Sequence, residues 1–107
     1  MSPRWHDEER DAWELAESLL QQARNMMREA EGAMEAWRTG KEMNRLRCER
    51  RGISQSDAEI RYSASANAKN AITNNNFHVG LAQMYYNAAA ANYARAMYLH
   101  TRDGARL

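Results

Sequence analysis

Proline, cysteine and phenylalanine each occur only once in this 107-residue chain. Because proline lacks a backbone N–H and breaks helices, its confinement to Pro3 leaves the rest of the chain free to form long ones. A single cysteine, Cys48, excludes an intramolecular disulfide and suits a reducing compartment. There is no run of about 18 apolar residues and no recognisable signal peptide. We therefore expect a protein that works in the cytoplasm, without a membrane.

Net charge is also small, at +1, but its distribution is uneven. Four basic and nine acidic residues occur up to Trp37, whereas six basic and two acidic residues occur from Arg38 to Gly52. The basic segment could contact phosphate groups or an acidic partner through Arg38, Lys41, Arg45, Arg47, Arg50 and Arg51. The segment contains no aromatic residue to stack on bases, and Glu42 and Glu49 can pair with its arginines. A solvated or internally paired face is therefore the favoured interpretation of this segment.

The stretch from Ser56 to Arg102 contains no proline and one glycine, and it predicts a single long helix. At about 1.5 Å per residue such a helix would be roughly 70 Å long. Ser56 and Glu59 have the spacing of a capping box, which marks its start. Gly52 is placed to close the preceding helix in a left-handed conformation.

The first helix is predicted to span about residues 3–38, with Ser2 as its cap and Pro3 in its first turn. Thr39 and Glu42 form a second capping box, so a short basic helix is expected over about residues 40–51. The alternative is one helix that continues through Gly40, at a cost of about 1 kcal/mol for the glycine.

Both long helices show apolar residues at alternating spacings of four and three, the pattern of helices that pack along their length. In the first helix the residues are Ala12, Ala16, Leu19, Ala23, Met26, Ala30, Ala33 and Trp37. In the long helix they are Ala68, Ile72, Asn75, Val79, Ala82, Tyr86, Ala89 and Tyr93. The two helices are therefore predicted to form an antiparallel hairpin with a thin, alanine-rich core.

A second apolar stripe lies on a different side of the long helix, at Phe77, Leu81, Met84, Ala88, Ala91 and Tyr98. A helix with two apolar faces needs two coverings, and the hairpin supplies only one of them. We therefore expect an all-α chain with one helical domain, residues 1–107, that self-associates into a helical bundle.

The middle of the long helix is unusual because it carries three consecutive asparagines, Asn74–Asn76, although asparagine is a mediocre helix former. Asn75 falls on the seam, where a buried amide needs a partner and so fixes register. Ligand binding by these asparagines is the alternative. Gly80 suggests a close approach by another helix. The expected self-association or partner interface comprises Asn75, Phe77, Val79, Gly80, Leu81, Met84, Tyr85, Tyr86 and Tyr93.

Residues that could carry catalysis are scattered. The three histidines His6, His78 and His100 are far apart and have no ligand spacing. The acidic residues of the first helix lack the Glu-x-x-His pattern of helical di-iron sites, so a solvated face is the favoured interpretation. Arginines beside Cys48 would favour a thiolate, but no histidine base accompanies it. We therefore expect no enzymatic activity, cofactor or metal.

The run Glu59-Ile60-Arg61-Tyr62, followed by Ser65, Asn67-Ala68, Ile72, Asn75 and Ala82-Gln83-Met84-Tyr85, resembles a family of small, functionally uncharacterised helical proteins encoded by bacteriophages of actinobacteria. The likeness covers about forty residues of the C-terminal half. It implies a phage accessory protein in the cytoplasm of a bacterial host. It also implies a fixed arrangement of Arg61, Tyr62, Asn67 and Asn75, and brings no catalytic residue with it.

These features and the resemblance are compatible with three functions. The leading one is a phage-type protein that binds, as a helical homo-oligomer, to a host protein. The alternative is an oligomer that binds nucleic acid or a nucleotide signal through the basic segment. A structural component of the virion is the third.

Overall fold

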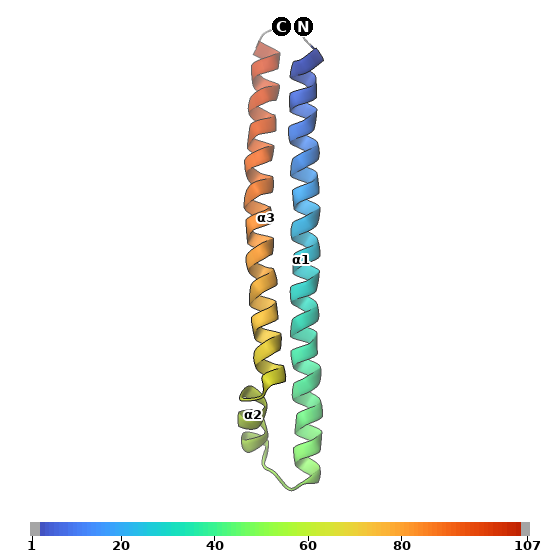
Figure 1. Cartoon of the computed structure of the whole chain (residues 1–107), viewed down its shortest axis with the longest axis vertical. Coiled ribbons are helices and arrows are strands. Elements are labelled where there is room, and N and C mark those ends of the chain that lie inside the picture. The colour runs from blue at the N-terminus through green and yellow to red at the C-terminus, as the bar shows by residue number, and fades with distance from the viewer. Residues whose placement is uncertain (1–2, 106–107) are drawn as a thin grey trace. The chain divides into compact units, whose positions relative to one another are not determined.

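The computed structural model describes residues 3–105, which form three α-helices (Figure 1). These are α1 (Pro3–Arg50), α2 (Gln55–Ser63) and α3 (Ala66–Ala105), and no strand occurs within the described range. The prediction of an all-α chain with two long helices and a short one between them is confirmed. The described residues up to Met26 and from Leu81 onward form one compact unit, unit 1, and Met27–Gly80 form another, unit 2.

The predicted break near Gly40 is wrong, because α1 continues without interruption to Arg50. The short helix between the long ones is α2, which contains one arginine and is not the predicted basic helix. Gly40 has a tertiary role: a Cβ at this position would lie 2.7 Å from the hydroxyl oxygen of Tyr62. That hydroxyl donates a hydrogen bond to the carbonyl oxygen of Trp37 at 2.6 Å. The glycine therefore makes room for Tyr62 and does not end a helix.

The end of α1 follows the prediction. Gly52 has a φ of +72°, in the left-handed region that glycine adopts without steric cost. Its N–H donates to the carbonyl of Glu49 at 3.0 Å, and the N–H of Ile53 donates to that of Cys48 at 2.9 Å. These two bonds form a Schellman motif, which satisfies carbonyl groups that the helix leaves unpaired.

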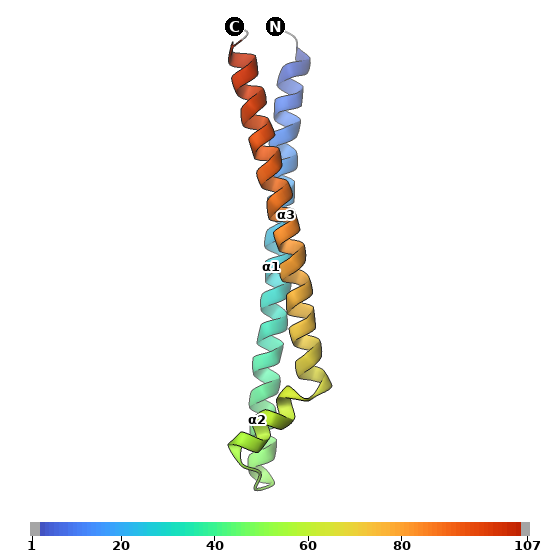
Figure 2. The same cartoon turned by 90° about the vertical axis from the view of Figure 1, so that its left-hand side faces the viewer.

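The long helix starts later than predicted. Ser54, not Ser56, caps α2, and its side chain accepts a hydrogen bond from the backbone N–H of Asp57 at 3.2 Å. Ser65 then separates α2 from α3: its hydroxyl donates to the carbonyl of Tyr62 at 2.6 Å and accepts from the N–H of Ala68 at 3.2 Å. The chain changes direction between α2 and α3 (Figure 2). One side chain thus ends α2 and begins α3. The predicted end at residue 102 was too early, because α3 continues to Ala105.

In unit 1 the start of α1 packs antiparallel against the end of α3. Ala12, Ala96 and Leu99 form its buried cluster, with Trp13 packed on them. Trp13 meets Tyr93 edge to face, with ring centroids 5.3 Å apart. At the end of the unit, Arg102 contacts Glu8 at 3.3 Å and the buried Asp103 at 3.2 Å. Burial lowers the pKa of Arg102, but its bonds to Asp103 and Glu8 outweigh this effect and raise it overall.

In unit 2 the end of α1 packs against α2 and the start of α3. Asn75 donates a hydrogen bond through Nδ2 to the carbonyl of Ala30 at 2.9 Å. Trp37 and Tyr62 pack with ring centroids 5.8 Å apart. Asn44 donates to the carbonyl of Ala58 at 2.9 Å, which attaches α2 to α1. Hydrogen bonds to the backbone carbonyls of Ala30 and Ala58 therefore attach α3 and α2 to α1 in this unit.

The alanine seams are the part of the packing that the sequence predicts best. Five predicted seam alanines of α1 are buried: Ala12, Ala16, Ala23, Ala30 and Ala33. In α3 the buried alanines occupy one heptad position, which the half-buried Asn75 takes between the first two of them: Ala68, Ala82, Ala89 and Ala96. The intervening residues Ile72, Val79 and Tyr86 are exposed, and the half-buried ones are Ala71, His78 and Tyr85. The seam therefore lies one residue earlier at these three positions. At the first of them the small Ala71 fits a close contact that Ile72 would not.

Candidate functional site

The second apolar stripe of α3 is exposed, as a partner-binding surface requires. Its six residues, hereafter the outer stripe, are Phe77, Leu81, Met84, Ala88, Ala91 and Tyr98. The three largest have exposed fractions of 61% for Phe77, 67% for Met84 and 65% for Tyr98. Leu81 and Ala88 are half-buried, because they border the internal seam. Among residues with described side chains, large apolar groups are buried only at Tyr62 and Leu99. The chain alone therefore covers little of its apolar surface.

The outer stripe has a regular spacing on α3. Its residues follow one another at intervals of four, three, four and three, up to Ala91. Continuing this pattern adds Arg95, an exposed residue, and then reaches Tyr98. This is the heptad spacing with which a helix packs along a second helix. The surface is thus a second seam, and Arg95 is its one charged member.

Charge is absent from the same part of α3. Between Lys69 and Arg95 the sequence contains no aspartate, glutamate, lysine or arginine. The exposed faces of α1 instead carry charged pairs, such as Arg10 with Asp7 at 3.0 Å and Arg38 with Glu35 at 3.5 Å. Depletion of charge together with enrichment in methionine and aromatic residues is the compositional mark of an interface core. Of the two long helices, α3 therefore offers the candidate interface.

The predicted interface residues are placed in different ways. Asn75 and Tyr93 serve packing within the chain, through their contacts with Ala30 and Trp13. A Cβ at Gly80 would meet nothing within 4 Å, so no neighbour within the described chain explains this glycine. Met84 is exposed, and Tyr85 is half-buried. The predicted interface thus divides between the internal seam, the outer stripe and two exposed side chains that belong to neither, those of Val79 and Tyr86.

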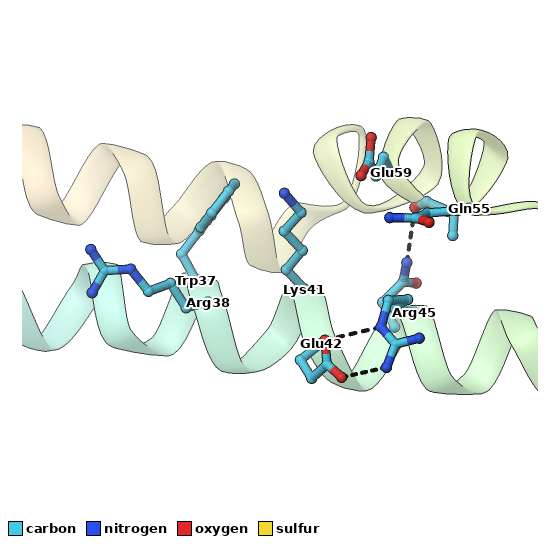
Figure 3. Close-up of a pocket in the computed structure, with 9 residues that line it drawn as sticks. Trp37, Arg38, Lys41, Glu42, Arg45, Gln55 and Glu59 are labelled. Atoms are coloured by element: carbon cyan, nitrogen blue, oxygen red, sulfur yellow. Dashed lines mark hydrogen bonds and ion pairs between the residues drawn. The ribbon is translucent and has the colours of Figure 1, made fainter.

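The basic segment forms part of a pocket of about 340 Å³ in unit 2 (Figure 3). Trp37 and Lys41 rise side by side from α1, whereas Gln55 and Glu59 belong to α2. The ammonium group of Lys41 lies 5.1 Å from the centroid of the Trp37 ring, a cation–π distance. The pocket therefore combines an aromatic wall, a cation and amide groups.

Arg45 is neutralised within α1, unlike the other arginines near the end of the helix. It bonds to Glu42 at 2.6 Å and to Glu49 at 3.1 Å. The hydrogen bond and the positive charge of Arg45 hold the pKa of Glu42 below its ordinary value. No described residue forms an ion pair with the exposed residues Arg47, Arg50 and Arg51. These three could meet an anionic partner without breaking an internal contact.

No group of three or more histidine, cysteine, aspartate or glutamate residues in the described part of the chain could hold a metal ion. His78 contacts the carbonyl of Asn74 at 2.9 Å, and His100 contacts Glu9 at 3.0 Å. The side chain of His6 lies outside the described residues. Cys48 is buried, with its sulfur 4.0 Å from Oδ1 of Asn44. No helix among the described residues is long and apolar enough to cross a membrane.

Several residues that shape these surfaces were missed by sequence reasoning. Trp37 was assigned only to the seam, although its ring also forms a wall of the pocket. Gln55 was not considered, because its role depends on where α2 begins. Arg95 could have been found by extending the spacing of the outer stripe by one step.

No protein-family model matches the chain, and no curated protein or solved structure was found to be similar to it.

Proposed function

We propose that the protein acts by binding, as a helical homo-oligomer whose copies meet through the outer stripe of α3. The exposure of this stripe is the observation that supports the proposal most directly. Burying an exposed methionine or phenylalanine side chain contributes about 1.5–3 kcal/mol. Several such side chains along one helix can offset the entropy lost on association, which is of order 4–15 kcal/mol.

A second copy is the partner that best suits the chemistry of the stripe. Its central part, from Phe77 to Ala91, is apolar and without charge, so it offers nothing to a strongly charged partner. An identical stripe has matching composition, and closed symmetric dimers are the commonest form of homo-oligomer. Such a dimer would cover the outer stripe in each copy.

Light scattering after size exclusion tests this proposal. The wild type should elute as a defined dimer or higher oligomer, and Met84→Glu should elute as a folded monomer, because the substitution places a charge in the stripe. Met43→Glu is the matched control, since Met43 is a methionine of similar exposure on α1. Circular dichroism confirms that both variants remain helical. A monomeric wild type, or equal loss of assembly in both variants, would contradict the proposal.

The proposed setting, a phage protein acting in a bacterial host, rests on the resemblance to actinobacteriophage proteins and stays a prediction. In that setting the oligomer would bind a host protein in the bacterial cytoplasm. Affinity purification from an infected host, with Met84→Glu beside the wild type, would show whether capture of a partner depends on assembly. Finding the protein in purified virions would favour a structural role instead.

A second candidate function rests on the exposed arginines at the end of α1. Arg47, Arg50 and Arg51 have no ion pair within the described residues, so they are available for phosphate groups. Binding of a fluorescent single-stranded DNA or a nucleotide should weaken steeply with salt, because phosphate contacts release counterions. Replacing all three with glutamine should abolish the binding, whereas Arg24→Gln, on the same helix, should not. Binding that is insensitive to salt would exclude this function.

A further inference from the structure

We infer that two copies pair antiparallel through α3, with Leu81 of one copy against Ala91 of the other and Met84 against Ala88. This inference rests on the proposed self-association and specifies its direction and register. All four residues belong to unit 1 and lie on the outer stripe.

The spacing of the stripe reads the same in both directions. From Leu81 through Met84 and Ala88 to Ala91 the intervals are three, four and three residues. Adding Phe77 and Arg95 extends the series to four, three, four, three and four. A second copy that runs in the opposite direction therefore presents its residues in step with those of the first. Each residue of one copy meets one of the other without a shift along the helix.

Side-chain sizes complement one another in this register. Leu81 and Met84 are large, and Ala91 and Ala88, which lie opposite them, are small. A parallel pair would instead place each residue opposite itself. The two alanine layers would then be left underfilled while two layers of large residues hold the helices apart, and gaps of this kind are unfavourable. The antiparallel pair fills each of the four layers formed by Leu81, Met84, Ala88 and Ala91 with one large and one small residue.

The position of Arg95 supports the same direction. In a parallel pair the two Arg95 side chains would lie opposite each other, with repulsion between like charges. In the antiparallel register the two Arg95 side chains are separated along the helix axis, so this repulsion is absent. The two neighbouring antiparallel registers that keep the spacing pair Ala88 with Ala91 or Leu81 with Met84, which leaves two small or two large residues opposite each other at the centre. The register with Leu81 against Ala91 is therefore preferred.

Cross-linking between single cysteines tests both direction and register. Cys48→Ser provides the background, and Leu81→Cys and Ala91→Cys are made in it separately. The two proteins, one carrying a mass tag, are mixed and treated with a short bis-maleimide. The mixture should give the mixed cross-linked dimer, whereas each protein alone should give none, because identical positions lie about 15 Å apart in the antiparallel pair. Thr39→Cys, an exposed position on α1, serves as the control for random collisions.

The outcomes distinguish a failure of this inference from a failure of the proposed self-association. Cross-linking of each single variant with itself, and not in the mixed pair, would show a parallel dimer and overturn the inference while self-association stands. Equal yields in all mixtures, with the Thr39→Cys control included, would show that no register is preferred and would also overturn it. A wild type that is monomeric in light scattering would remove the proposed self-association itself.

Discussion

The hydroxyl group of Tyr62 occupies the space that a side chain at Gly40 would need. A Cβ at position 40 would lie 2.7 Å from the hydroxyl oxygen and 3.2 Å from Cε1 of the ring. The hydroxyl donates its hydrogen bond to the carbonyl of Trp37, on the same turn of α1. Gly40 therefore weakens α1 locally but leaves room for Tyr62 to attach α2 to α1. These two effects on stability have opposite signs.

Gly40→Ala should destabilise the protein even though alanine is the better helix former. Alanine in a helix is favoured over glycine by about 1 kcal/mol, but forcing a methyl group into an occupied space typically costs about 1–3 kcal/mol. Gly32→Ala, on the same helix with nothing within 4 Å of the added Cβ, should stabilise instead. Urea unfolding followed by circular dichroism measures both. A Gly40→Ala variant that is more stable than the wild type would show that Tyr62 yields easily.

Tyr62→Phe should make Gly40→Ala less harmful, because it removes the atom closest to the new methyl group. By itself Tyr62→Phe should lose about 0.5–1.5 kcal/mol, the usual contribution of a hydrogen bond. The double variant should then be more stable than the sum of the single changes implies, by roughly 0.5–3 kcal/mol. The same urea titrations, applied to the wild type, the two single variants and the double variant, complete this double-mutant cycle. Strict additivity would mean that the hydroxyl and the methyl group do not compete for space.

Sequence reasoning succeeded where local physical rules decide the structure. The proline-free stretches formed long helices, and Gly52 ended α1 in the predicted conformation. It failed at Gly40, where the result depends on Tyr62, and at Ser65, which caps a new helix. Tyr62 contacts the chain 25 residues away, and spacing along a helix contains no information about such a contact. A capping serine at position 65 was visible, but the helical pattern on both sides of it concealed the break.

Asn75→Ala should lower stability, because it removes the hydrogen bond from Nδ2 to the carbonyl of Ala30. The expected loss is about 0.5–1.5 kcal/mol for the bond, reduced by the better helix propensity of alanine. Asn76→Ala is the control, since Asn76 is exposed, and it should stabilise by a few tenths to about 0.7 kcal/mol. Thermal unfolding of the two variants compares them directly. If both changes stabilise the protein equally, the bond to Ala30 contributes nothing.

The candidate interface, like the fold, could be predicted from the sequence only in part. The outer stripe could be found from apolar spacing alone, and its exposure agrees with a helix that has two apolar faces. Val79 and Tyr86 were assigned to the internal seam, but they are exposed in the structure. At positions three and four residues after a seam residue such as Asn75 or Ala82, apolar character alone does not decide which residue faces the partner helix. The packing of the two helices decides it, and that is not a property of one helix.

The carboxyl group of Glu42 should titrate at a lower pH than an ordinary glutamate. The hydrogen bond from Arg45, together with its positive charge, lowers the pKa of Glu42 below the usual value of 4.5. A carboxylate whose pKa is lower in the folded state stabilises the fold above its unfolded pKa, and this contribution is lost as the pH falls through the folded pKa. The effect is therefore present at neutral pH and disappears in the acid range below about pH 4.5.

Arg45→Gln should return the pKa of Glu42 toward its ordinary value, because glutamine provides no positive charge. Arg47→Gln should leave it unchanged, since Arg47 makes no contact with Glu42. A pH titration of the side-chain carboxyl resonance by NMR measures the pKa in all three proteins, and high salt should reduce the difference between them. The stability difference between Arg45→Gln and the wild type should likewise shrink as the pH is lowered through the acid range. A Glu42 that titrates at the same pH with and without Arg45 would mean that the pair does not persist in solution.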